Sequence, residues 1–214
     1  MIEEIKERLA LVREKIARVR SPDEIVIVAV TKGFGADTCR AALSAGLHIL
    51  GENRVHEAIL KMEEVPDAEW HLIGHLQTNK VRQAAGRFTL IHSVDSVRLA
   101  TELARVQPQQ AVLLEINVAR EPQKHGAEPE RAQEAITEIA RVANLRGLMA
   151  MGPSQGDPAS AFRELRQIRE EAEQRLGKSL PVLSMGMSGD FEVAVAEGST
   201  MLRLGQALFG PRPS

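Results

Sequence analysis

Apolar and polar positions along the chain fall into two alternating patterns. Short uninterrupted apolar runs are separated by longer segments in which apolar residues recur every three or four positions. The run Ile25–Val30 is typical of a strand buried on both faces, as in a parallel sheet covered by helices. Residues 2–19 place isoleucine, leucine and valine on one helical stripe. The pattern therefore predicts an N-terminal helix followed by alternating strands and helices.

The apolar runs predict eight strands. They are expected at residues 25–31, 47–50, 70–74, 89–93, 111–117, 145–151, 181–185 and 201–204. Helices are expected at 36–46, 54–63, 77–86, 95–106, 129–143, 162–176 and 190–197, with a short one at the end of the chain. Eight such units favour a (β/α)8 TIM barrel over the alternative, an open doubly wound sheet. The segment Lys32–Gly35 also lacks the third glycine of a dinucleotide-binding fingerprint.

Composition narrows the class of protein. The 214 residues are 43% hydrophobic, contain no linker or repeat, and predict a single domain spanning 1–214. Lysine plus arginine total 27 against 29 acids, so no basic field favours nucleic acid or a membrane surface. The start of the chain is acid-rich and amphipathic rather than a signal peptide, and no apolar run approaches the roughly 18 residues that span a membrane. One cysteine, Cys39, fits a reducing cytoplasm.

Candidate chemistry gathers at the carboxyl ends of the predicted strands, where barrel active sites lie. The first strand ends in Lys32, and the last contains Arg203 within an otherwise apolar run. A lysine at a strand end commonly extends its amine into water. The alternative is a Schiff-base amine, whose pKa is lowered by an apolar wall and by a nearby cation such as Arg203. The sequence alone leaves both interpretations open.

Two glycine-bearing loops follow the seventh and eighth strands, a common place for a phosphate in barrels. Ser188 and Gly189 precede the seventh helix, and Gly205 follows the last strand. Ser188 could donate its hydroxyl to a phosphate, or it could only cap the helix. A phosphate site beside a nucleophilic lysine predicts a phosphorylated aldehyde. The candidates are pyridoxal 5′-phosphate (PLP) and the substrate of a sugar-phosphate aldolase.

Several motifs resemble one known family, the pyridoxal phosphate homeostasis proteins, which are single-domain relatives of the alanine racemase barrel. The resemblance runs from about residue 2 to 210. The motifs are Ala29-Val30-Thr31-Lys32, Gly51-Glu52-Asn53, the segment 71–80, Ser93-Val94-Asp95, the segment 184–190 and Arg203-Leu204-Gly205. The resemblance implies an alanine racemase-like barrel that holds PLP as a Schiff base.

The resemblance also implies roles for individual residues. Lys32 would carry the Schiff base, Arg203 would face the pyridine nitrogen, and Asn53 would lie near the ring. Ser188 and the backbone of Gly205 and Gln206 would contact the phosphate, and the predicted cofactor contacts also include His71 and Met185. The chain departs from the family at Gln206, where threonine is usual, at His75, which replaces proline, and in the segment 149–153. The loop Gln123–Gly126 keeps a lysine and a glycine.

An arginine at the pyridine nitrogen keeps that nitrogen unprotonated, which makes the ring a poor electron sink. Racemases of this type add a second base, a tyrosine, and this chain contains no tyrosine. We therefore expect a protein that holds PLP for vitamin B6 homeostasis without efficient turnover; the alternative is a PLP-dependent amino-acid racemase or lyase, with His71 or His92 as the second base.

The remaining expectations concern partners and metals. His71 and His75 lie on a strand and a loop rather than on one helix face, so no metal site is predicted. Apo forms of PLP-dependent enzymes are candidate acceptors of the cofactor, and a monomer is expected.

Overall fold

The computed structural model describes residues 1–211, whose strands form one closed parallel barrel. Each strand pairs with its neighbours in chain order, and β8 closes on β1 with Val28 opposite Arg203. The strands are β1 Val26–Val30, β2 Ile49–Glu52, β3 Glu69–Leu72, β4 Leu90–Val94, β5 Ala111–Glu115, β6 Asn144–Met149, β7 Val182–Ser184 and β8 Met201–Leu204. The predicted barrel is confirmed and the open sheet is excluded. The single domain predicted for 1–214 stays a prediction, and its last three residues lie outside those described.

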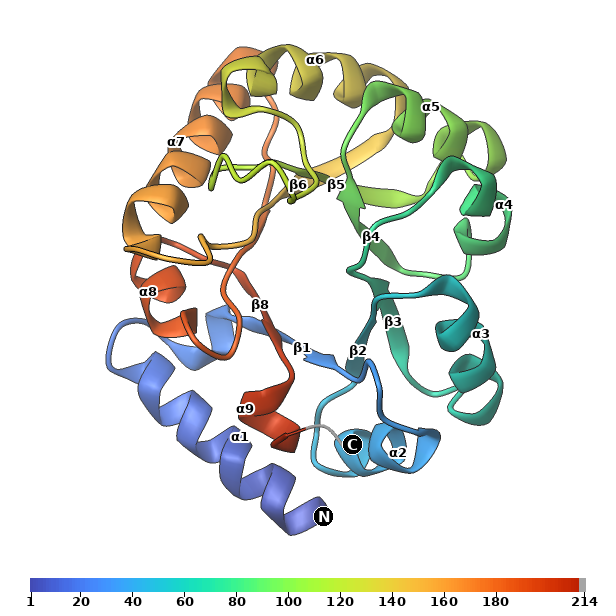
Figure 1. The fold of residues 1–214 in the computed structure, drawn as a ribbon, viewed down its shortest axis with the longest axis vertical. Helices are drawn as coiled ribbons and strands as arrows, with labels where there is room; N and C mark the ends of the chain where they lie inside the picture. The colour runs from blue at the N-terminus through green and yellow to red at the C-terminus, as the bar shows by residue number, and fades with distance from the viewer. Residues whose placement is uncertain (212–214) are drawn as a thin grey trace.

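The helices form an outer ring around the strands (Figure 1). They are α1 Ile2–Ala17, α2 Ala36–Ser44, α3 Val55–Glu64, α4 Val81–Ala84, α5 Val97–Val106, α6 Ala132–Val142, α7 Pro158–Leu176, α8 Phe191–Ala196 and α9 Gln206–Phe209, with short 3-10 turns η1 Pro22–Glu24, η2 Thr78–Lys80 and η3 Pro129–Arg131. The helix predicted at 77–86 is split into η2 and α4, because Thr78 and Asn79 favour turns. Helix α7 begins earlier than predicted, since the Asp157 carboxylate accepts the Ala159 N–H over 2.9 Å.

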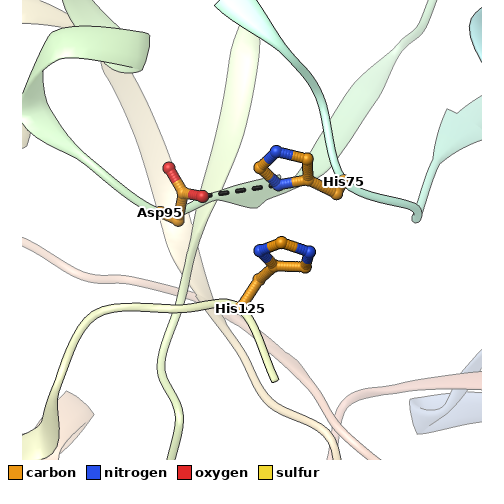
Figure 2. A group of neighbouring side chains, drawn as sticks. All are labelled: His75, Asp95 and His125. Carbon is orange, nitrogen blue, oxygen red and sulfur yellow. Dashed lines mark ion pairs between the residues drawn. The ribbon is translucent and has the colours of Figure 1, made fainter. Parts of the chain in front are cut away.

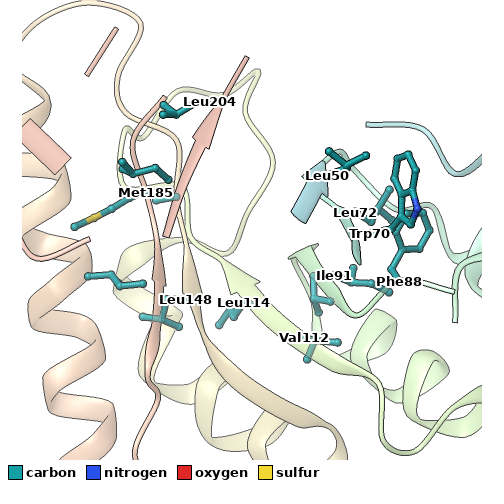
Figure 3. Packing of buried hydrophobic residues seen from close by; sticks show 14 of the residues in the cluster. Leu50, Trp70, Leu72, Phe88, Ile91, Val112, Leu114, Leu148, Met185 and Leu204 are labelled. Carbon is teal, nitrogen blue, oxygen red and sulfur yellow. The ribbon is translucent and has the colours of Figure 1, made fainter. Parts of the chain in front are cut away.

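Two apolar layers lie on either side of the strands. The inner layer consists of Val28, Leu90, Leu113, Met149 and Met201. The outer layer packs the strands against the helices, and Figure 3 shows part of it, including Leu50, Trp70, Leu72, Ile91 and Leu114. Side chains alternate between these layers along each strand. This alternation decides which residue at each strand end faces the barrel mouth.

The predicted N-terminal helix α1 lies outside the barrel and packs against α9, α2 and α8. Its buried residues Ile5, Leu9, Val12 and Ile16 form the stripe seen in the sequence. Within residues 1–211, we find no helix whose length and apolar character would let it cross a membrane.

The first strand is buried only in its second half. Val26 is 37% exposed, and the fully buried residues of β1 begin at Val28.

Candidate functional site

A cavity of about 490 Å³ opens at the carboxyl ends of the strands. Its wall contains six of the eight residues predicted to contact a cofactor, namely Lys32, Asn53, Ser188, Arg203, Gly205 and Gln206. Sequence reasoning missed its apolar part, which is supplied by Phe34, Ile73, Met149, Met151 and Met187. The cavity therefore gathers residues from the ends of β1, β2, β7 and β8, and its volume lies within the roughly 300–1,000 Å³ that is usual for small-molecule sites.

Lys32 lines the cavity because of the alternation along β1. Val28 belongs to the inner apolar layer, and Val30 and Lys32 both line the cavity above it. Thr31, between them, is fully buried and faces α3, where Lys61 contacts it. The strand thus directs the amine of Lys32 to the barrel mouth, as predicted.

Behind Lys32, three polar side chains join the ends of β1 and β2 to α3. The Thr31 hydroxyl donates to Glu52 Oε1 over 2.6 Å, and Lys61 Nζ donates to the Thr31 carbonyl oxygen over 2.9 Å. Lys61 Nζ also pairs with Glu52 Oε1 at 2.5 Å, and these side chains are only 11% and 0% exposed. This buried ion pair holds the backbone from which Lys32 extends.

Arg203 is 4% exposed, and its guanidinium is held by Ser184 at the end of β7 and by Ala150, which follows β6. Nη1 donates to the carbonyl oxygen and the hydroxyl of Ser184 at 2.8 and 2.7 Å. Nη2 donates to the Ala150 carbonyl oxygen at 2.9 Å. Burial lowers the pKa of Arg203 to about 10, which still leaves the guanidinium charged at neutral pH. The side chain is therefore a fixed cation and hydrogen-bond donor in the cavity wall.

A chain of hydrogen bonds continues from Ser184 through the barrel interior. Ser184 Oγ lies 3.0 Å from His92 Nδ1, and His92 Nε2 lies 3.0 Å from His71 Nδ1. His71 Nε2 lies 3.1 Å from Glu69 Oε1. Burial lowers the pKa of His92 well below its usual value, with His71 and Arg203 adding to the effect, so His92 is neutral. The hydrogen bond with His71 lowers the pKa of Glu69, which makes that carboxylate the final acceptor.

The groups at the two ends of this chain constrain it. The Glu69 carboxylate can only accept, so His71 Nε2–H donates to it. Neutral His92 has one donor and one acceptor nitrogen, so it can bridge His71 and Ser184. At the other end the Ser184 hydroxyl oxygen accepts from Arg203, and the chain holds the guanidinium in one orientation.

Two of the predicted contacts lie away from the cavity. His71 is 2% exposed and lies deeper in the barrel than Ile73, which lines the cavity two positions later. Met185 is fully buried in the outer layer, because the preceding Ser184 faces inward (Figure 3). The structure brings Met187, not Met185, to the cavity wall. His71 reaches Arg203 only through the hydrogen-bond chain.

Ser188 links the two loops that were predicted to bind an anion. Its Oγ accepts the backbone N–H of Ala207 over 3.0 Å, which joins the loop after β7 to the first turn of α9. Because the oxygen accepts this bond, the hydroxyl proton can be donated to another group. In the same turn, Leu208 and Phe209 donate to the Gly205 carbonyl oxygen, so Gln206 is the residue of α9 that can offer its backbone N–H and its side-chain amide to a ligand. This edge of the cavity, with Gly205 and Gln206, is therefore suited to an anion.

Glu115 is a buried acid that was not among the predicted site residues, because the strand was expected to continue to Asn117. Glu115 is the last residue of β5 and is 3% exposed. Burial raises its pKa to about 7; the charge of Arg203 opposes the rise, and that of Asp95 adds to it. An acid directly after the apolar run 111–114 was the available signal.

We expect Glu115→Gln to change how stability depends on pH. The folded protein keeps the Glu115 proton up to about pH 7, whereas the carboxyl has an ordinary pKa of 4.5 when unfolded. The stability from the neutral acid is thus complete below about pH 4.5 and is lost as the pH rises to about 7, by on the order of 3 kcal/mol. Urea unfolding of both proteins across this range should show the wild type losing stability relative to Glu115→Gln. Parallel pH profiles would mean that Glu115 ionises normally.

Comparisons with known proteins agree with this fold. A family model for the alanine racemase N-terminal domain matches residues 2–213. The chain is 39% identical to the pyridoxal phosphate homeostasis protein of Aquifex aeolicus over 222 aligned positions, covering 96% of this chain and 97% of that protein. The structure of PipY from Synechococcus elongatus PCC7942 with PLP bound has a TM-score of 0.86 and 36% identity, covering 96% of this chain and all (100%) of that one. Alanine racemase of Clostridium difficile 630 shares the fold alone, with a TM-score of 0.77, 14% identity and coverage of 99% of this chain and 58% of that one.

The closed barrel and its cavity thus define a relative of the alanine racemase N-terminal domain. The chain belongs to the pyridoxal phosphate homeostasis protein family, as its motifs predicted.

Proposed function

We propose that this chain holds PLP as a Schiff base on Lys32 and takes part in intracellular vitamin B6 homeostasis. The observation that carries the proposal is the cavity itself, in which Lys32, Arg203 and Ser188 line one space. The curated relative from Aquifex aeolicus is named for PLP homeostasis, and PipY has been solved with PLP bound. Both the residues of the cavity and the functions of these relatives therefore support the proposal.

The donor set fits the chemical parts of the cofactor. An aldehyde needs an amine, which Lys32 supplies. A phosphate needs hydrogen-bond donors, which the Ser188 hydroxyl and the backbone N–H of Gln206 supply. Arg203 offers N–H groups to a ring nitrogen, and Met149, Met151 and Ile73 offer apolar contacts to a ring face. Gln206, which replaces the usual threonine, can still donate through its amide.

The covalent step needs only groups of this chain and the aldehyde. The ε-amine of Lys32 adds to the aldehyde carbon, a C=N double bond forms, and the carbonyl oxygen leaves as water. When bound, PLP supplies an electron sink for amino-acid chemistry. Arg203 limits that capacity, because a guanidinium with a pKa near 10 does not transfer its proton to the ring nitrogen at neutral pH.

Storage or delivery fits the cavity better than racemisation. Racemisation needs a proton donor or acceptor on each face of the substrate. Lys32 supplies one such group. Both ring nitrogens of His92 and of His71 already have hydrogen-bond partners inside the barrel, so neither is suited to act as the second base. We therefore propose a carrier or regulator in the cytoplasm, monomeric and not bound to nucleic acid or membranes, that passes PLP to apo-enzymes.

The experiment is to locate the cofactor chemically. The protein is loaded with PLP, reduced with borohydride and digested with trypsin, and the peptide masses are measured by mass spectrometry. We expect the added pyridoxyl phosphate mass on the peptide that contains Lys32. A mass found only on other lysines would overturn the proposal, and addition of D- or L-alanine with rapid turnover would favour the racemase.

A further inference from the structure

Three side chains that the proposed cofactor site does not use converge at the barrel rim (Figure 2). His75 follows β3, Asp95 follows β4, and His125 belongs to the loop between β5 and η3. One nitrogen of each imidazole and one carboxylate oxygen lie within 4.8 Å of one another. His75 Nδ1 and Asp95 Oδ2 are 3.4 Å apart.

We propose that His75, Asp95 and His125 form a binding site for a divalent transition-metal ion such as Zn²⁺. Two imidazoles and one carboxylate are a donor set that such ions prefer, whereas Mg²⁺ and Ca²⁺ prefer oxygen ligands alone. Three protein ligands leave at least one position for water. The pairing of His71 with His75, considered from the sequence, is excluded because both nitrogens of His71 are engaged inside the barrel.

The distances are close to those of a metal centre. With metal–ligand bonds of about 2.0–2.1 Å, two ligands on a tetrahedral ion lie roughly 3.3 Å apart. The contact between His75 and Asp95, at 3.4 Å, already has that spacing. The rings of His75 and His125 are stacked, with centroids 3.9 Å apart and planes at 12°. One ring must turn so that both lone pairs meet the ion, and both residues are exposed enough to turn freely.

The backbone beneath the histidines is firmly held. The Ser93 hydroxyl donates to the Gly74 carbonyl oxygen over 2.6 Å, which ties the loop carrying His75 to β4. A Cβ on Gly74 would overlap the Asn53 carbonyl oxygen, so the loop passes directly against the residue that follows β2. The backbone positions of the ligands that follow β3 and β4 are thus set before an ion binds.

The loop carrying His125 is anchored on both sides of the histidine. Lys124 Nζ donates to the Gly152 carbonyl oxygen over 2.7 Å. The Ala127 N–H donates to the Glu115 carbonyl oxygen over 2.8 Å. Gly126, with φ of +117°, has its Cα so close to Asn117 that a Cβ would lie 2.8 Å from the Asn117 nitrogen. His125 is therefore presented from a fixed bend, and only its side chain needs to move.

The charges around the site favour a cation. A groove beside Asp95 is lined by Glu128, Glu134 and Glu138 against the single cation Arg131. An ion of charge +2 would be attracted to this side of the rim, although Lys124 lies next to His125. The site would tie together the loops after β3, β4 and β5.

The test is a metal titration of protein prepared without a histidine tag and stripped with a chelator. Co²⁺ is the probe, because histidine-bound Co²⁺ gives visible ligand-field bands, and Zn²⁺ should remove them by competition. We expect one equivalent to bind. Each of the variants His75→Gln, Asp95→Asn and His125→Gln should weaken binding by roughly tenfold or more.

His48→Gln is the matched control, because His48 is exposed at the opposite end of β2, and it should bind like the wild type. Circular dichroism of each variant checks that the fold is retained. Absence of the bands in the wild type would overturn the site. Equal affinity of the wild type and all three ligand variants would assign the binding to other surface groups and would overturn it as well.

Discussion

Lys32→Ala is expected to abolish covalent attachment of PLP completely while leaving the barrel folded. The side chain of Lys32 lines the cavity and carries the amine that would react. Lys32 lies two positions beyond the end of β1 at Val30. The adjacent Thr31 is held through its own hydroxyl and carbonyl groups, which the substitution leaves in place. The free energy of unfolding should therefore change by no more than about 1 kcal/mol.

Reduction with borohydride followed by mass measurement checks the first part, and thermal unfolding checks the second. Lys80→Ala is the matched control, because Lys80 is an exposed lysine on the same rim. The Lys80→Ala variant should still give the peptide that contains Lys32 with the added pyridoxyl phosphate mass. Persistent covalent attachment in Lys32→Ala would show that another lysine is the partner, and an unfolded variant would show that Lys32 is structural.

Lys61→Met is expected to cost about 3–5 kcal/mol of stability, the usual result of removing one partner of a buried ion pair. Methionine fills a similar volume but leaves the fully buried Glu52 carboxylate without its cation. Glu52 Oε2 already has no hydrogen-bond partner within the described part of the chain. The remaining Thr31 hydroxyl cannot compensate a whole charge.

The double variant Lys61→Met/Glu52→Gln provides the control, because it removes the unpaired charge. Urea unfolding at neutral pH should show the double variant recovering part of the loss. A single variant as stable as the wild type, or a double variant no better than the single one, would contradict a stabilising role for the pair. Because the pair holds Thr31, we also expect Lys61→Met to weaken PLP retention.

Most of the barrel and most of the candidate site were predictable from local pattern. Each apolar run is long enough to identify a strand, and the polar residue that follows it marks the rim, as with Lys32 after β1. Depth and direction were harder to predict. Met185 directly follows β7 but faces the helices, since a shift of one residue reverses the side-chain direction. His71 lies within β3 and faces inward, but below the cavity.

Lys61 illustrates a signal that was present but unused. It continues the buried stripe of α3 that begins with Val55 and Ala58, where an unpaired lysine would be costly. The sequence could show that a partner was needed. It could not show that the partner was Glu52, because that depends on how α3 packs over β1 and β2.

The sequence by itself determined the order of strands and helices, the family, and the side chains available at the rim, because these depend on short-range periodicity and on motifs. Only the tertiary structure decided which of those side chains meet. The closure of β8 on β1, the chain from Arg203 to Glu69 and the meeting of His75, Asp95 and His125 all join residues distant in sequence. Their distances follow from strand register and loop packing, which arise only when the barrel closes.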